Sequence, residues 1–409
     1  MDTGLQADRP GRSVGPPRER SCRHVGRVGR ALEVARPLLR GPPARIRGDA
    51  MRGGPNAAAL AAPATIDVHV SSVLAGRVLA ENIPVVSAQL EASTDRTPRE
   101  RLTLEAPHGW VPRDPGDPLN NYGQRLHVVQ TITTGGVTTR VKVGIYQIDA
   151  WEETSTGGVS VTAYDLLQRC EKNPMDWPSS PPGGATVSSE FQRLAGSPDE
   201  GGLQVIVDDG DQAIPRTFEW GTSRTEAMGK LADAYGLAWT VRPDGCLHVW
   251  KPATGVASET YTGRDLLIEA ARKSAERRPN RWFVGTTGET PEGGGGDAPH
   301  YDGVATLYDA PYQPAVYGVV TERSEMQMTD LEGTVQQAAE TYRAKALAAR
   351  GTRSLALASD PRIELWDTIS VETGEEVVTG TVTGYSIDLA DSDAQMRVDL
   401  EVYASVNAR

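Results

Sequence analysis

One segment of the sequence superficially resembles a phosphate-binding loop. Residues 221–230 read GTSRTEAMGK. Its two glycines are eight positions apart instead of the five that such a loop needs, and Leu231 stands where the magnesium-binding Ser or Thr belongs. Ser223 and Glu226 have the spacing of a capping box, so the segment predicts the capped start of a helix and not a nucleotide site.

Two further groups contain residue types that bind metal ions. Cys246 and His248 lie two positions apart on a predicted strand, where they would share a face, but no third ligand is near them in sequence. Asp208, Asp209 and Asp211 lie in a Gly-containing turn of the kind calcium favours, yet the EF-hand spacing and its closing Glu are missing. We interpret the first pair as strand packing and the second group as a solvated turn, and we expect no metal ion or other cofactor.

A catalytic constellation is not recognisable in the sequence. There is no HExxH motif and no GxSxG elbow, and the abundant carboxylates single out no pair for glycoside hydrolysis. Cys170 would need a His partner that the sequence cannot place, and the three cysteines show no CxxC spacing. The eight Trp are scattered singly, which favours packing over a carbohydrate-stacking platform. The sequence therefore predicts that the protein is not an enzyme.

Charge separates the first fifty residues from the rest of the chain. They contain eleven Arg, no Lys and five acidic residues, a net charge of +6, so the remaining residues carry −18 of the total of −12. We expect a disordered basic leader over residues 1–60, either an over-extended translation start with Met51 as the true initiator or a basic arm that touches DNA. An acidic body argues against tight binding of nucleic acid and suits a surface past which nucleic acid moves without sticking.

Two β-rich parts flank a mixed part of the chain. Thr65 begins a series of short β-segments, and Gly135-Gly136 is a two-residue hairpin signal within it. The mixed part contains helices predicted to end at Gly196 and Gly236 and a hairpin across Pro243-Asp244-Gly245. These patterns predict a mainly β fold, in which two small antiparallel β-barrel domains flank a mixed α/β domain. The predicted domains are the leader (1–60), a first barrel (61–172), an α+β insert (173–265), and a second barrel (266–409) with an inserted loop (288–300) and helix (331–350).

Four segments carry a family resemblance: GIYQIDAWEETSTGGVSVTAYDLLQRCEK, TSRTEAMGKLADAYGLAWTVRPDGCLHV, RRPNRWFVGTTG and AAETYRAKALAARGTRSLALASDPRIELWDTISVETG. Their order resembles the tail-hub (tail-tip, or minor tail) proteins of actinobacterial siphophages and prophages. It is similar, at greater distance, to the baseplate hubs of contractile phages. The segments span residues 65–405, and they are scaffold motifs. Residues 1–50 and the 288–300 loop depart from the family.

The resemblance implies a structural role. Hubs of this kind are homotrimers whose two barrels per chain give six barrels in a ring. Such a ring joins the sixfold tail tube and distal-tail ring to the threefold tip and encloses a DNA channel without binding DNA specifically. The implied partners are the distal tail, tape-measure, tail-tube and tip or fibre proteins, and the implied location is the virion tail tip, assembled in the bacterial host cytoplasm. Candidate interface or hinge residues are Ile363, Leu365, Trp366 and Asp367; packing within one chain is the alternative for them.

Alternative functions remain open from the sequence. A hub of a phage-like contractile injection system would share the fold and look alike. A tail-associated cell-wall hydrolase or carbohydrate-binding protein belongs to another class, and the missing catalytic constellation argues against it. A secreted adhesin is disfavoured because the basic leader lacks the apolar core of a secretory signal.

Overall fold

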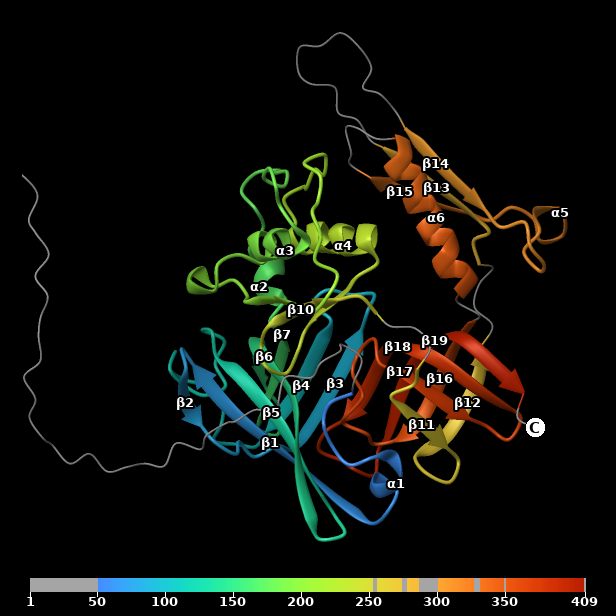
Figure 1. The fold of residues 1–409 in the computed structure, drawn as a ribbon. Coiled ribbons are helices and arrows are strands. Elements are labelled where there is room, and N and C mark those ends of the chain that lie inside the picture. Colours follow the sequence, from blue (N-terminus) through green and yellow to red (C-terminus); the bar gives the residue numbers. More distant parts are fainter. Residues whose placement is uncertain are drawn as a thin grey trace, which may run out of the picture. The chain divides into compact units, whose positions relative to one another are not determined.

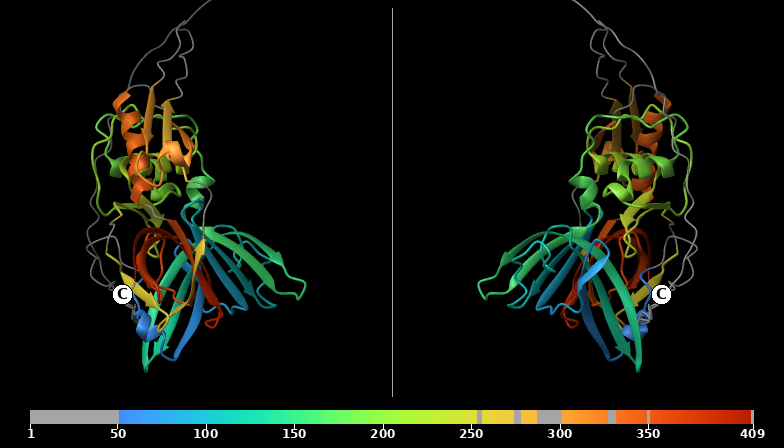
Figure 2. Two further views of the ribbon diagram at one scale, coloured as in Figure 1. Left: turned by 90° about the vertical axis from the view of Figure 1, so that its right-hand side faces the viewer. Right: turned by 90° about the vertical axis from the view of Figure 1, so that its left-hand side faces the viewer.

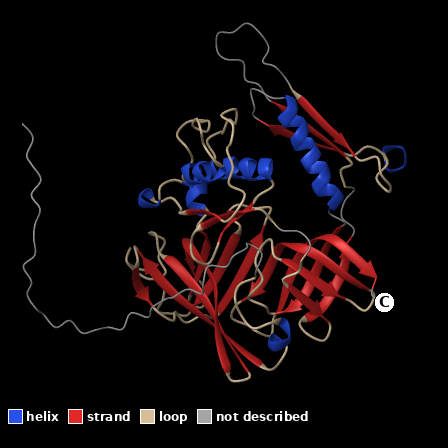
Figure 3. Ribbon diagram, viewed as in Figure 1, coloured by secondary structure: helices blue, strands red, loops and turns tan. Residues whose placement is uncertain are grey.

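Strands dominate the chain, as the sequence predicted (Figure 3). The computed structural model describes residues 51–252, 256–273, 278–286, 301–326, 332–348 and 351–407. These residues belong to one compact unit, Ile46–Arg409. Residues 1–50 of the predicted leader and the predicted loop 288–300 lie outside the described residues. The predicted mainly β class is confirmed.

Thirteen strands form one sheet, paired in the order β12-β16-β19-β18-β3-β4-β7-β6-β5-β1-β2, with β17 on β18 and β11 on β17 (Figure 1). Burial alternates with a period of two along most of these strands, because successive side chains of a strand point to opposite faces. The N-terminal strands are β1 (Ala64–Leu74), β2 (Arg77–Ala80), β3 (Ser87–Ser93), β4 (Glu100–Ala106), β5 (Arg125–Thr134), β6 (Val137–Glu153) and β7 (Val159–Asp165). The C-terminal strands are β11 (Glu259–Thr262), β12 (Leu267–Lys273), β16 (Gly351–Ala358), β17 (Thr368–Glu372), β18 (Glu376–Asp388) and β19 (Gln395–Asn407).

Strand β18 joins the two β-rich parts. One edge of it pairs with β19, while the other pairs with β17 over 377–381 and with β3 over 384–388. The prediction of two separate closed barrels therefore needs correction: among the described strands no closed barrel is found, and a single sheet runs through both parts. Sequence patterns missed this because they report which face of a strand is buried and not which strand lies beside it.

The mixed part forms a second core over residues 166–249. A three-stranded sheet, β8-β10-β9, packs with three helices, and the predicted helix ends at Gly196 and Gly236 are present. Ser223 accepts a hydrogen bond from the Glu226 N–H at 3.2 Å, which confirms the predicted helix cap. The elements are α2 (Gln168–Glu171), α3 (Val187–Ala195), the short 3₁₀ helix η1 (Pro198–Glu200), β8 (Val205–Val207), α4 (Arg224–Tyr235), β9 (Ala238–Val241) and β10 (Leu247–Trp250).

A third, small core is formed by residues that lie between β12 and β16 in the sequence. Val284, Ala305, Val335 and Ala339 form it, where α6 crosses a three-stranded sheet ordered β14-β13-β15 (Figure 2). The helix lies so close to β14 that a Cβ at Gly303 would collide with the Val335 backbone. The elements are β13 (Arg281–Thr286), β14 (Asp302–Thr306), α5 (Pro314–Tyr317), β15 (Thr321–Met326) and α6 (Glu332–Ala348). Sequence analysis did not separate this part from the second β-rich region.

Residues 51–60, which sequence analysis assigned to the disordered leader, pack onto the large sheet. Met51 and Leu60 are buried in its core, and α1 (Ala57–Leu60) is capped by Asn56, which accepts from the Ala59 N–H at 2.9 Å. The division of the chain into domains otherwise stays a prediction.

Gly380 gives a direct test of the strand packing around β18. A Cβ there would lie 2.6 Å from the Glu401 carbonyl oxygen of β19, whereas a Cβ at Gly374 meets nothing. We expect Gly380→Ala to lower the free energy of unfolding by about 1–3 kcal/mol through overpacking. Gly374→Ala is the matched control and should change it by less than about 0.5 kcal/mol. Urea unfolding measures both, and equal effects would contradict the close approach.

Candidate functional site

The four candidate residues of the IELWD segment lie in the loop between β16 and β17. Ile363 and Leu365 are buried in the core of the large sheet, and Asp367 is only 4% exposed. Trp366 is half-buried. In the described chain this segment is therefore an internal junction, and its neighbours define the candidate site.

Arg52 is the centre of a buried ionic cluster at this junction. Its guanidinium donates to the Ile363 carbonyl at 2.8 Å and to the Pro361 carbonyl at 3.2 Å. It also forms ion pairs with Glu100 at 3.3 Å and Glu364 at 3.5 Å. Burial alone would lower the pKa of Arg52, but the surrounding acidic groups raise it well above its ordinary value, so the cation is retained. A fully buried guanidinium thus links the N-terminal segment, β4 and the IELWD loop.

Two buried tyrosines complete the ionic cluster around Glu100. Tyr146 of β6 and Tyr385 of β18 each donate to a different oxygen of the Glu100 carboxylate at 2.8 Å. Burial raises the pKa of both phenols well above the ordinary value, and the Glu100 charge raises it further. The hydroxyls therefore stay protonated and act as hydrogen-bond donors. The ionic cluster, defined as Arg52, Glu100, Tyr146, Tyr385 and Glu364, joins residues from both β-rich parts.

Asp367 lies beside this cluster as a second buried carboxyl group. It accepts from the Glu364 backbone N–H at 2.6 Å. Burial and then the nearby Glu364 charge raise the pKa of Asp367 well above its ordinary value. A neutral Asp367 avoids placing two negative charges side by side in the interior.

A stack of aromatic rings and guanidinium groups connects the junction to the insert. Arg99 lies 4.5 Å from the Trp239 ring centre and 4.7 Å from that of Trp366. Trp366 meets Trp250 edge to face at 5.7 Å. Arg242 in turn covers Trp250 at 4.5 Å. Cation–π contacts of this kind contribute roughly 0.5–2 kcal/mol each, so this aromatic stack fixes the insert on the large sheet.

The backbone at Trp366 is in the left-handed region, with φ of 66°. Such a conformation is unfavourable for a bulky residue and persists only where the surroundings impose it. Here the Trp366 N–H donates to the Val382 carbonyl at 2.9 Å, and the Val382 N–H donates back to the Asp367 carbonyl at 2.8 Å. The turn directs the indole toward the insert and leaves the loop bonded to β18.

A second ion-pair group fastens the start of the same loop to β11. Arg362 pairs with both oxygens of Asp360, at 2.9 and 2.7 Å, and with Glu259 at 2.8 Å. Tyr261 donates to Asp360 at 2.8 Å. Glu259 also accepts from the Ala57 N–H at 3.2 Å. The N-terminal segment and β11 are therefore tied to one loop.

His248 of β10 is held between two carboxylates inside the insert. Its Nδ1 lies 3.0 Å from Asp208 and its Nε2 lies 2.9 Å from Asp244. Burial lowers the pKa of His248, but the two carboxylates outweigh it and raise the pKa above its ordinary value. Asp209 and Asp211 accept backbone N–H groups of Lys251 and Ser188. Asp208, Asp209 and Asp211 are all exposed, so the turn is solvated as predicted, and it is also hydrogen-bonded.

The chemistry available at the junction is that of a structural lock. The cavity beside Glu100, Arg242 and Asp367 measures about 20 Å³, enough for one water-sized group. Among the described residues, no three His, Cys, Asp or Glu side chains gather in a way that could hold a metal ion. Burial raises the pKa of the Cys170 thiol to about 12, which disfavours the thiolate that a nucleophile needs. Within the same ranges, no helix is long and apolar enough to span a membrane.

Comparison with solved structures identifies the fold. The structure matches the tail protein from Neisseria meningitidis MC58 with a TM-score of 0.55 and 14% identity, over 82% of this chain and 96% of that one. It matches the 43 kDa tail protein of prophage MuSo2 from Shewanella oneidensis with a TM-score of 0.54 and 15% identity, over 81% and 98%. The chain shares its fold with these two tail proteins. No protein-family model and no curated protein sequence matches it.

Sequence analysis named the IELWD residues as candidates but not the residues that surround them, and their role stays a prediction. Arg52 was placed in the disordered leader, and Glu100, Tyr146 and Tyr385 are single residues on unrelated strands. The sequence carried a weak signal for these three residues, because the Glu and the two Tyr interrupt strand faces that are otherwise apolar and buried. Only the pairing of β18 with β3 brings them together.

Removal of Arg52 tests the ionic cluster. Arg52→Met should lower the free energy of unfolding by roughly 3–5 kcal/mol, because it leaves Glu100 buried without a counter-charge. Adding Glu100→Gln should restore part of that loss. Arg77→Met, at an exposed arginine of β2, is the control and should have little effect. Urea unfolding reports all three, and an Arg52→Met protein as stable as the control would refute the role of the cluster.

We expect His248 to make the stability depend on pH. Because the folded pKa is raised, the advantage of the native protein over His248→Gln should be complete below about pH 6, and it should vanish as the pH rises through the folded value. The difference in the free energy of unfolding between the native protein and His248→Gln should reach about 1 kcal/mol. Urea unfolding of both proteins at about pH 5.5 and about pH 8.5 measures it. His127→Gln should show the opposite sign, since burial and then Arg125 lower the pKa of His127.

Proposed function

We propose that this chain is a non-enzymatic structural protein of a phage tail, of the hub or baseplate type. The observation that carries the proposal is the fold, which two solved tail proteins share over 96% and 98% of their own lengths. The matches also cover 82% and 81% of this chain, so the likeness extends over most of the chain and not over one domain alone.

The junction supports a mechanical role. The ionic cluster and the aromatic stack connect the N-terminal segment, the large sheet and the insert through buried or half-buried groups. The cavity beside Glu100 in this lock measures only about 20 Å³, and the lock would transmit force between parts of the chain. In this proposal the packing inside each chain of the assembled particle is anchored by Ile363, Leu365, Trp366 and Asp367.

The assembly we propose is a homotrimeric ring. The two β-rich parts of each chain, joined through β18, would act as neighbouring wall segments, so three chains would give six. The ring would join a sixfold tail tube and distal-tail ring to a threefold tip, beside the tape-measure and fibre proteins, at the virion tail tip. Heterologous contacts that close on themselves build rings of this kind.

Charge is compatible with a channel through which DNA passes. The chain carries −18 outside its first fifty residues. Negative charges on the protein repel the negatively charged phosphate backbone of DNA. A wall of such subunits would therefore let DNA slide past without specific binding. A hub of a phage-like contractile injection system would use the same design.

The mass in solution tests the ring. We expect light scattering at high protein concentration to give about three times 43.8 kDa, and electron micrographs to show threefold particles. A strict monomer at every concentration would contradict the ring.

A separate assay on purified cell walls tests the non-enzymatic role. We expect no clearing of the walls, and clearing would contradict that role.

A further inference from the structure

Strand β1 has a free edge over most of its length. One edge pairs with β5 over residues 64–73, whereas β2 covers the other edge only over residues 72–74. On that second edge, the Val70 carbonyl accepts from the Ile83 N–H at 2.8 Å. Among the described residues, no backbone hydrogen bond reaches the second edge between Val70 and the start of the strand.

The backbone groups of Ile66 and Val68 point to this free edge. Successive residues of a paired strand direct their N–H and C=O groups to opposite edges, so residues two and four positions from Val70 share its direction. A row of unpaired donors and acceptors of this kind is a template for another strand. An extended polypeptide is therefore the class of occupant that the edge fits.

An open groove of about 290 Å³ lies along the same edge. Residues 66–68 of β1 line it, together with Ile83, Pro84 and Val85 of the connector that follows β2. Ile66, Val68 and Val85 also pack against the buried core of the large sheet. A strand added here would place every second side chain on these apolar groups, as a half-buried strand does.

The charge at this groove is negative. Asp67 is the only charged residue among the described residues that line it, and it is exposed. Its neighbour across the sheet on β5 is the uncharged Thr131. Glu81 and Asp391, both exposed, directly adjoin lining residues in the chain. Since cross-strand pairs of opposite charge stabilise a sheet, the outward positions of an added strand favour Lys or Arg.

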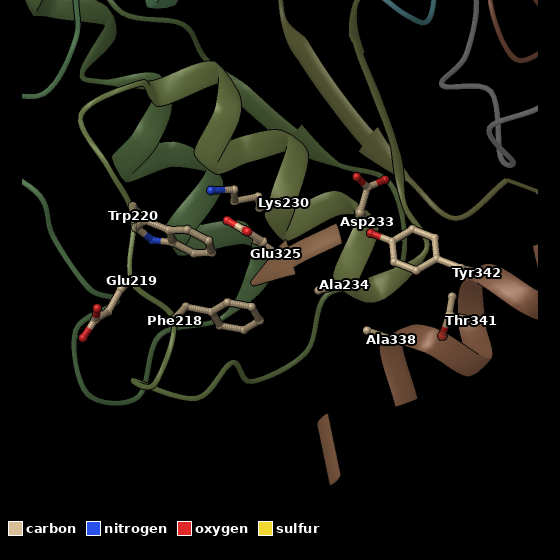
Figure 4. A pocket seen from close by; sticks show the side chains of 10 residues that line it. All are labelled: Phe218, Glu219, Trp220, Lys230, Asp233, Ala234, Glu325, Ala338, Thr341 and Tyr342. Carbon is tan, nitrogen blue, oxygen red and sulfur yellow. The ribbon is translucent and has the colours of Figure 1, made fainter. Parts of the chain in front are cut away.

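A second hollow, between α4 and α6, lacks such an indication of its occupant (Figure 4). It measures about 70 Å³, and Phe218, Trp220 and Tyr342 are among its lining residues. Most of the lining residues belong to the two helices. Backbone groups inside a helix are already bonded within it. The groove beside β1 is the larger site and the one where unpaired backbone groups specify a strand.

We propose that the groove beside β1 binds a short extended segment of a partner protein, in which apolar residues alternate with Lys or Arg. The apolar side chains would cover Ile66 and Val68, and a basic side chain would lie beside Asp67. In strand addition, main-chain hydrogen bonds supply affinity and the alternating side chains supply specificity. The inference does not depend on the proposed ring, because a single chain contains the whole groove.

A labelled peptide tests the charge at the site. The probe is a short synthetic peptide that alternates lysine with valine, and fluorescence anisotropy measures its binding to the full chain. Asp67→Lys should weaken this binding about tenfold, because it places like charges side by side. Asp176→Lys alters an exposed aspartate outside the groove and should bind like the native chain. Matching urea midpoints establish that both variants are folded, and equal binding by the two would contradict the inference.

Methylation of the peptide backbone distinguishes strand addition from other contacts. A strand that joins one edge uses the N–H groups of every second residue. Two further peptides therefore carry methyl groups on the backbone nitrogens of all valines or of all lysines. One of them should bind at least about tenfold more weakly, and the other should bind like the unmethylated peptide. If both bind alike, the backbone edge is not used and the inference is wrong.

A second copy of this chain is the other occupant that the experiments can reveal. In that case the peptide would not bind, and Asp67→Lys would change the mass of the assembly in light scattering. That result would overturn the inference and leave the proposed ring standing. Peptide binding by a chain that stays monomeric would do the reverse.

Discussion

The structure depends on the burial of one permanent charge, that of Arg52. A guanidinium cannot shed its proton under ordinary conditions, so an interior that encloses it must surround it with acceptors. Glu100, Glu364 and two backbone carbonyls supply them. These acceptors come from a strand of the N-terminal part and from a loop of the C-terminal part. Satisfying this buried cation therefore brings distant segments of the chain together.

Hydrogen bonding within the sheet reinforces the same junction. Strand β18 pairs with β17 and then with β3 along one edge, so the two β-rich parts are connected by backbone bonds as well as by charge. Trp366 adopts its unfavourable φ of 66° at this point and carries the connection to the insert through Arg99 and Trp250. Strain that persists at a buried contact indicates that the neighbouring packing is strong enough to impose it.

Burial sets the acid–base behaviour of the groups at this junction. Burial raises the pKa of the Tyr146 and Tyr385 phenols and of the Asp367 carboxyl well above their ordinary values.

The sequence by itself determined the mainly β class, the helix cap at Ser223 and the hairpin at Gly135-Gly136, because these depend on neighbours a few residues apart. Tertiary structure alone decided that the β-rich parts form one sheet, that Arg52 belongs to the core, and that His248 lies between Asp208 and Asp244. Periodicity reveals which face of a strand is buried. It carries no information about the partner strand, and a buried charge becomes intelligible only when the residues that neutralise it have been brought beside it.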